Sequence, residues 1–173
     1  MRSYPVALPV LAAALAAALG GCDAPTSSSA LEVTLTNTPD PAVATPASGV
    51  YYTIKGDDSH PDQTVAYPWR TTFTVSIQET GGKAVDITAV NLNVKQASGG
   101  IVITPSGGAT EYYQFNSSAT GNHINAHGSA GVGFEVHYDL PNKGREALVT
   151  VTIGFVDADS NSYSRTLGVK VAP

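Results

Sequence analysis

The sequence is poor in cysteine, methionine and basic side chains, and each shortage excludes a class of protein. Cys22 is the only cysteine, so the chain cannot form an internal disulfide. A blue-copper site is excluded because its thiolate would have to be Cys22, and a methionine-rich copper carrier is excluded because Met1 is the only methionine. Lysine and arginine total 9 against 14 acidic residues, which gives a formal net charge of -5. This balance argues against nucleic acid as a partner, because nucleic-acid binding needs a clustered basic surface.

Long apolar runs are also scarce, and the longest lies near the N-terminus. Residues 6–19 carry no charge, and Arg2 is the only charged residue before Asp23. A helix that crosses a bilayer needs about 20 apolar residues, so this run is short for a permanent span. It fits the apolar region of a secretory signal that follows a positive start. We therefore expect residues 1–21 to be a signal peptide that is cut away.

The end of this run resembles the lipobox of bacterial lipoproteins, an aliphatic residue and two small residues before a cysteine. The matching residues are Leu19, Gly20, Gly21 and Cys22. The resemblance implies cleavage between Gly21 and Cys22 and a diacylglycerol on the Cys22 sulfur, and it accounts for an otherwise unpaired cysteine. The alternative is an ordinary secretory signal with an incidental cysteine.

A lipid anchor would place the protein at the bacterial cell envelope, outside the cytoplasm. Stable attachment takes roughly two acyl chains, each buried methylene contributing about 0.8 kcal/mol, and a lipidated cysteine carries two or three chains. The inner and outer membranes both stay open as the location. Residues 22–30 are small and polar after the cysteine, and we expect them to form a flexible tether. Residues 31–173 would then form one domain.

Period-two alternation of apolar and polar residues dominates this domain. Such alternation is typical of a β-strand with one face on a core and one in water. The expected strands are 31–36, 50–55, 72–78, 85–94, 101–104, 112–116, 132–140, 147–155 and 163–171. No segment shows a convincing helix of three turns, so the sequence predicts an all-β domain of about eight short strands.

Two local features predict how particular strands begin, end or bend. The glycine pair at 81–82 lies between two expected strands and favours a tight hairpin. Apolar residues keep one parity over 85–89 and the opposite parity over 90–94. A strand cannot keep both sets on one face without an extra residue. We therefore expect a β-bulge, or a strand that changes sheets, near residues 88–90.

Short strands separated by turns favour a two-sheet antiparallel sandwich. The pattern is similar to immunoglobulin-like or fibronectin-III-like modules of bacterial cell-surface lipoproteins. Residues 69–94 carry the resemblance with a tryptophan, an alternating strand, a Gly-Gly turn and a return strand, and residues 150–171 look like a closing hairpin. A Cys-Trp-Cys framework is absent, so an antibody-type domain is not indicated. Such folds host many functions, so this resemblance implies a shape and not an activity.

Histidines and aspartates supply two candidate metal sites. His123 and His127 lie four residues apart and could bind zinc or copper, although their segment is also typical of a polar loop. The D-x-D-x-N sequence that begins at Asp157 resembles the opening of a calcium loop. The glycine and glutamate that an EF-hand needs later are replaced by Ser162 and Gly168, so a hairpin turn with solvated aspartates is the favoured interpretation.

Adjacent tyrosines supply a candidate ligand-binding surface. Tyr51 and Tyr52 form one pair, and Tyr112 and Tyr113 form another. Neighbours in a strand point to opposite faces, so one of each pair could be exposed and stack on a sugar or anchor a protein partner. Tyr52 and Tyr113 are the candidates for that role, although the favoured interpretation is that Trp69 and half of the tyrosines fill the core.

The residue types taken together favour a binding or structural module over an enzyme. The sequence offers no evident acid–base pair, nucleophile or phosphate loop, and no cofactor is expected beyond the lipid on Cys22. We expect a lipid-anchored envelope module with an unknown protein or glycan partner. An accessory carbohydrate-binding module and a metal-binding protein that uses His123 and His127 are the alternatives.

Overall fold

The computed structural model describes residues 31–97, 113–141 and 143–173. These residues form eleven β-strands and no helix, so the all-β prediction is confirmed. The strands are β1 (Val33–Thr38), β2 (Ala42–Pro46), β3 (Tyr51–Ile54), β4 (Gln63–Ala66), β5 (Trp69–Glu79), β6 (Val85–Gln96), β7 (Tyr113–Ala119), β8 (His123–Ile124), β9 (Ser129–Tyr138), β10 (Ala147–Asp157) and β11 (Ser162–Ala172). The predicted signal peptide, its cleavage site at Gly21 and Cys22, and the predicted strand 101–104 lie outside the described residues.

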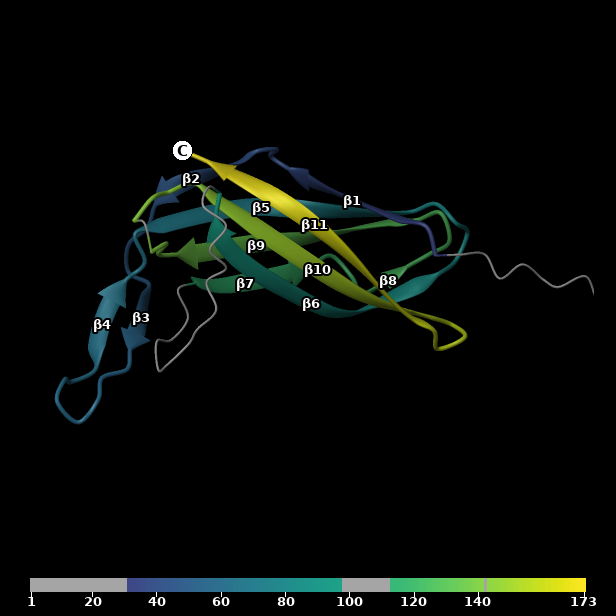
Figure 1. The fold of residues 1–173 in the computed structure, drawn as a ribbon. Coiled ribbons are helices and arrows are strands. Elements are labelled where there is room, and N and C mark those ends of the chain that lie inside the picture. Colours follow the sequence, from purple (N-terminus) through teal and green to yellow (C-terminus); the bar gives the residue numbers. More distant parts are fainter. Residues whose placement is uncertain (1–30, 98–112, 142) are drawn as a thin grey trace, which may run out of the picture.

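Nine strands form one continuous, curled sheet (Figure 1). Its order is β7-β9-β5-β2-β11-β10-β6-β8, with β1 pairing to β5 next to β2. All pairs are antiparallel except β11 with β2, which is parallel. The sheet is therefore mixed and not purely antiparallel as predicted. The short strand β2 causes the difference, because it pairs with β5 on one side and with β11 on the other.

One hydrophobic core lies inside the curl and draws on both halves of the strand order. Alternate residues of each long strand contribute to it, as the period of two requires. Its fully buried members include Val75, Ile77, Val94, Val132, Val136, Val149, Val151, Ile153 and Phe155. The rings of Phe73 and Phe134 stack inside it with their centroids 5.1 Å apart. The residues between these positions form the outer face of the sheet.

The predicted irregularity in β6 is a β-bulge. Ala89 pairs with Gly154, whereas Ile87 pairs with the next residue of β10, Phe155, so Thr88 is the extra residue. β6 continues through the bulge as one strand and does not change sheets. The parity change in the sequence is thus absorbed locally, so that Ile87 before the bulge and Val90 after it both pack against the core, whereas Ala89 is exposed.

The predicted hairpin at Gly81-Gly82 is wrong. β5 pairs with β1, β2 and β9, whereas β6 pairs with β8 and β10, so the two strands that flank the glycines are not neighbours in the sheet. The glycines belong to a connection that crosses from one half of the curl to the other. Gly82 has a φ of 80°, which a glycine adopts without a steric penalty.

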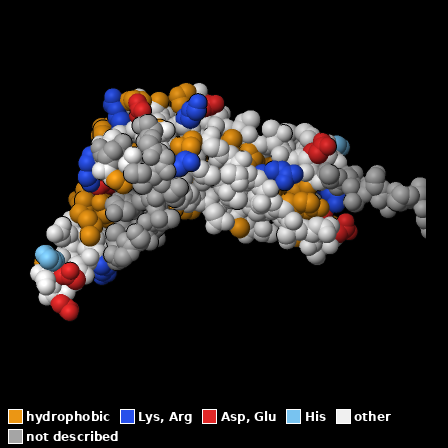
Figure 2. All heavy atoms as spheres, viewed as in Figure 1, with side chains coloured by type: hydrophobic (Ala, Val, Ile, Leu, Met, Phe, Trp, Pro, Cys, Tyr) orange, Lys and Arg blue, Asp and Glu red, His pale blue; other side chains and the backbone are white. Residues whose placement is uncertain are grey.

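β3 and β4 form a separate two-stranded sheet that projects from the main body, and we call residues 51–66 the arm (Figure 1). Its tip carries the acidic residues Asp57, Asp58 and Asp62 beside His60 (Figure 2). The tip is ordered by its own hydrogen bonds, because Asp57 accepts from the backbone of Ser59 and His60.

The described chain enters the fold at the end opposite the arm (Figure 1). We call this the tether end, which comprises Leu31 and the connections at 80–84 and 158–161. The other end, where β5 begins and β11 finishes beside the arm, is the arm end. Among the described residues, no helix is long and apolar enough to span a bilayer.

Candidate functional site

A polar groove crosses the outer face of three neighbouring strands, β5, β9 and β7. It has a volume of about 470 Å³. Its lining residues are Thr38, Pro39, Thr72, Phe73, Thr74, Asn116, Ser117, Ser118, Gly133, Phe134 and Glu135. The volume lies within the range of about 300–1,000 Å³ that small-molecule sites occupy.

The groove forms because the central strand has little side chain on its outer face. Buried Val132, Phe134 and Val136 point into the core, so Gly133 lies on the opposite face. Gly133 pairs with Thr74 of β5 on one side and with Ser118 of β7 on the other. A Cβ added at Gly133 would lie 3.3 Å from the Ser118 Oγ, so any side chain there would occupy the groove.

Glu135 places a carboxylate in the groove, and His137 holds it. Their side chains lie two residues apart on the same face of β9, and Glu135 Oε1 is 2.8 Å from His137 Nε2. The His137 ring is buried, whereas the Glu135 side chain is 43% exposed. The Tyr67 ring lies with its centroid 6.4 Å from that of His137. Glu135 is therefore an accessible acceptor with a fixed, buried neighbour.

A buried carboxylate, Asp139, attaches the arm close to this pair. Its Oδ2 accepts a hydrogen bond from the Tyr52 hydroxyl at 2.9 Å and lies 2.7 Å from Lys143 Nζ. The rings of Tyr52 and Tyr67 pack with their centroids 4.8 Å apart. Tyr52, from β3, thus joins the arm to the end of β9.

Four buried polar atoms lack a hydrogen-bond partner among the described residues, and all lie near the arm end. They are Trp69 Nε1, Thr71 Oγ1, His137 Nδ1 and Asp139 Oδ1. An unsatisfied buried polar atom costs about 1–3 kcal/mol. The hydrogen bonding of buried polar atoms at the arm end is thus incomplete among the described residues.

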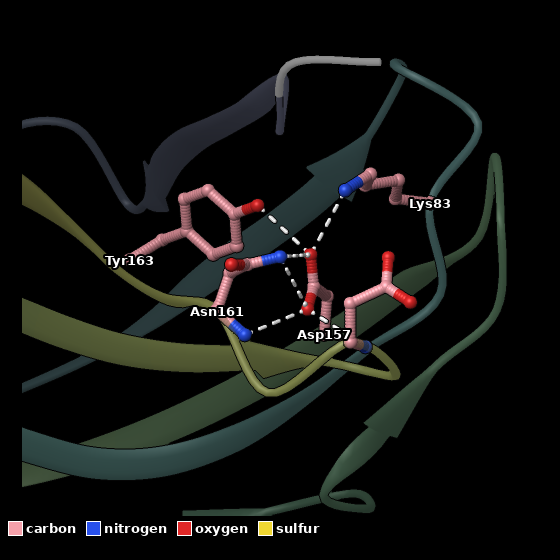
Figure 3. A network of polar contacts seen from close by, with 5 residues as sticks. Lys83, Asp157, Asn161 and Tyr163 are labelled. Atoms are coloured by element: carbon pink, nitrogen blue, oxygen red, sulfur yellow. Dashed lines mark hydrogen bonds and ion pairs between the residues drawn. The ribbon is translucent and has the colours of Figure 1, made fainter. Parts of the chain in front are cut away.

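The tether end holds a fully bonded carboxylate, Asp157 (Figure 3). Oδ2 accepts hydrogen bonds from Lys83 Nζ at 2.9 Å and from the Tyr163 hydroxyl at 2.8 Å. Oδ1 accepts from the backbone N–H groups of Asp159 and Asn161. The Lys83 ammonium and the Asn161 amide hold the pKa of Asp157 far below its usual value, against the opposing effect of desolvation.

A second carboxylate of this end, Glu79, is completely buried. It accepts backbone N–H groups from Gly81 at 2.8 Å, Gly82 at 3.0 Å and His127 at 2.8 Å. Desolvation alone would raise the pKa of Glu79, but these donors and the backbone N–H of Lys83 together hold it below its usual value. Glu79 therefore ties the 80–84 connection to the loop before β9.

The histidines predicted to bind metal are both exposed, and each has another role. His123 Nδ1 is 2.8 Å from Asp86 Oδ1 across the β6–β8 pair. His127 has a φ of 58°, and its backbone N–H bonds to Glu79. Throughout the described part of the chain, no group of three or more His, Cys, Asp and Glu side chains is arranged to hold a metal ion.

The calcium-like sequence is a turn, as the favoured interpretation had it, but its first aspartate is not solvated. Asp157 is buried in the network of Figure 3, and its oxygens are already occupied by donors. The segment closes the β10–β11 hairpin, which confirms the closing hairpin predicted for residues 150–171.

The structure places the candidate tyrosines differently from the sequence prediction. Tyr52 is only 7% exposed, whereas its neighbour Tyr51 is 58% exposed. The expectation that one member of the pair is exposed is confirmed, but Tyr52 is the wrong member. Tyr113 is partly buried against the core, and its hydroxyl donates to the Leu92 carbonyl at 2.9 Å. Neither ring lines the groove.

Sequence reasoning missed the groove residues. The available signal was the pair of glycines at 131 and 133 within an alternating strand, since glycine in a strand often marks a place where another group approaches closely. The polar walls could not be assigned without the pairing of β9 with β5 and β7.

Comparison with known proteins does not place the chain in a family. No protein-family model matches it, and no significantly similar curated protein was found. One similar solved structure is the secreted serine protease VesC from Vibrio cholerae, at 11% identity and a TM-score of 0.35 over 60% of this chain. The chain spans only 20% of that protein. Another is the Northeast Structural Genomics Consortium target SoR45, at 11% identity and a TM-score of 0.44, with 83% of this chain and 86% of that chain covered. At these TM-scores neither similarity carries an argument about function.

Proposed function

We propose that the protein is a lipid-anchored binding module of the bacterial cell envelope, without catalytic activity of its own. The Leu19–Cys22 sequence supports the anchor. The observation that carries the binding role is the polar groove of about 470 Å³ on the outer face of β5, β9 and β7. The partner is a protein or a glycan of the envelope.

The point at which the chain enters the fold supports an orientation of the domain relative to the membrane. Leu31 lies at the tether end, and its carbonyl accepts a hydrogen bond from Arg165 at 2.6 Å. Residues 23–30 extend to about 26 Å at most. An anchor on Cys22 would keep the tether end near the membrane and direct the arm away from it.

We also infer that the curled sheet is an immunoglobulin-like sandwich whose two sheets share one strand. The shared strand is β2: among the described residues, the pairing order β7-β9-β5-β2 continues into β11-β10-β6-β8 through the parallel pairing of β2 with β11. That pairing involves Val171 with Ala42 and Ala172 with Val43. A single core packed between the halves supports this interpretation.

Lipidation is tested by labelling bacteria that express the full chain with radioactive palmitate. We expect label in the wild-type protein and in Ser28→Ala, a matched change within the tether, but none in Cys22→Ser. Intact mass should show that the wild-type chain begins at a modified Cys22. A mature chain with an unmodified Cys22, or label that persists in Cys22→Ser, would contradict the proposal.

A further inference from the structure

The floor of the groove cannot take a partner by strand addition. β9 pairs with β5 along residues 69–78 and with β7 along residues 113–119, so its backbone is engaged on both sides where the groove lies. An extended peptide that adds to a sheet needs a free edge of backbone donors and acceptors. Recognition in the groove must therefore come from side chains.

The walls of the groove offer side-chain hydroxyls and an amide. Thr72 and Thr74 project from β5, and Asn116 and Ser118 project from β7. Each hydroxyl can donate one hydrogen bond and accept others, and the asparagine amide offers both kinds of group. Rows of mixed donors and acceptors match a ligand whose own groups are also mixed, as the hydroxyls of a sugar are.

The charge of the groove narrows the ligand class further. Glu135 is its only charged lining residue, and no basic side chain lines it among the described residues. A carboxylate accepts hydrogen bonds from ligand O–H or N–H groups and repels an anion. The His137 ring fixes that carboxylate through Nε2, with Oε1 2.8 Å away. The groove therefore disfavours phosphates and acidic sugars.

We propose that this groove binds a neutral or amino-sugar oligosaccharide, with Glu135 accepting hydrogen bonds from its hydroxyl or amino groups. The inference rests on the proposed binding function and names its ligand class and its site. The ligand lies across the Gly133 backbone, where its ring faces can approach because no side chain intervenes. Thr72, Thr74, Asn116 and Ser118 hydrogen-bond to it from the two sides. Tyr52 and Tyr113 have no part in this site.

The test is an array of neutral, amino-sugar and acidic oligosaccharides, probed with the purified full chain in detergent. Binding constants for the strongest sugar follow by calorimetry. Gly133→Val fills the groove with a residue that strands favour, and it should weaken binding at least 10-fold. Gly168→Val is the matched control, because Gly168 lies on β11, outside the groove, where a Cβ meets only Leu148 at 3.6 Å. It should bind as the wild-type chain does.

Glu135→Gln provides a second variant that keeps the side-chain shape and removes the charge. We expect about a 5-fold loss of affinity for an amino sugar, with a thermal midpoint close to that of the wild-type chain. This variant keeps the inference testable even when Gly133→Val fails to fold.

Three outcomes would overturn the inference. They are an array without binding to any neutral or amino sugar, a preference for acidic sugars, and sugar binding that Gly133→Val and Glu135→Gln leave unchanged. The mass of the same preparation reports its lipid state. A lipidated protein that binds no sugar would contradict this inference but not the lipid anchor. An unlipidated protein that binds sugars would contradict the lipid anchor but not this inference.

Discussion

The buried carboxylates at the two ends of the molecule differ in how completely they are bonded. At the tether end, both oxygens of Glu79 and both oxygens of Asp157 accept hydrogen bonds. At the arm end, Asp139 uses Oδ2 for Tyr52 and Lys143, but Oδ1 has no partner among the described residues. The carboxylates of the tether end therefore hold its connections in place. The arm end instead keeps buried polar atoms that have no hydrogen-bond partner among the described residues.

Loss of the Glu79 side chain should produce the largest effect on stability. Glu79→Ala leaves the backbone N–H groups of Gly81, Gly82 and His127 without this carboxylate as their acceptor. Since a hydrogen bond to a charged group contributes about 1.5–3 kcal/mol, we expect the loss of the three bonds to lower the free energy of unfolding by about 4 kcal/mol, measured with urea. Glu79→Gln should recover part of this loss, because its amide oxygen still accepts. A loss below 1 kcal/mol for Glu79→Ala would show that the tether end does not depend on this carboxylate.

Asp157 should give the next largest effect and a distinct dependence on pH. Its pKa is lowered in the folded state, so its ionised form contributes stability above the unfolded-state pKa of about 3.9. That contribution is lost as the pH falls below about 4 toward the folded-state pKa. The urea midpoint of the wild-type chain should therefore fall between pH 5 and pH 2.5.

Asp157→Asn supplies the control for this prediction. It removes the titrating group, so the midpoint should be lower at pH 7 and should change less on acidification. We expect its thermal midpoint at pH 7 to fall by about 10 °C, because the Lys83 ammonium loses its charged partner. Parallel curves for the two proteins between pH 5 and pH 2.5 would contradict the assignment.

Tyr52→Phe tests how the arm is held at the opposite end. The change removes the hydroxyl that donates to Asp139 and keeps the ring that packs on Tyr67. We expect a loss of about 1 kcal/mol in the free energy of unfolding. Amide hydrogen exchange should become faster in residues 51–66 but not in the β10–β11 turn. Equal acceleration at both ends would show that the arm is not a separate unit.

His123→Ala should have the smallest effect. The His123–Asp86 pair is exposed, with 58% and 56% of the two side chains accessible, and such pairs contribute about 0–1 kcal/mol. We expect less than 0.5 kcal/mol by urea unfolding, and no change in zinc affinity by calorimetry. If the wild-type chain bound zinc measurably and His123→Ala did not, the result would support the predicted metal site.

Strand content was predictable because alternation reports directly on a half-buried strand, and the bulge at Thr88 was predictable because it reverses that alternation. Strand β2 was missed because its buried residues, Ala42 and Ala44, are small and lie among prolines typical of a turn. The hairpin at Gly81-Gly82 was mistaken because a glycine pair fits a crossing connection equally well, and only the strand pairing distinguishes the two.

The candidate site was less predictable than the fold because it depends on contacts between distant segments. Tyr52 is buried because β3 brings it against Asp139, which lies 87 residues further along the chain. The groove requires Gly133 to lie between Thr74 and Ser118, and no local pattern encodes that arrangement. The adjacent tyrosines suggested a ligand-binding surface in the sequence, whereas threonines, serines and a glycine form much of the wall and floor of the groove.

The most direct test of this account maps where a ligand acts on the molecule. Amide chemical shifts of the full chain in detergent would be followed during titration with the strongest sugar from the array. We predict that the largest shifts fall on residues 72–74, 116–118 and 131–135, with little change at 80–84 and 158–161. Shifts concentrated at the tether end instead would contradict the assignment of structure to that end and binding to the groove.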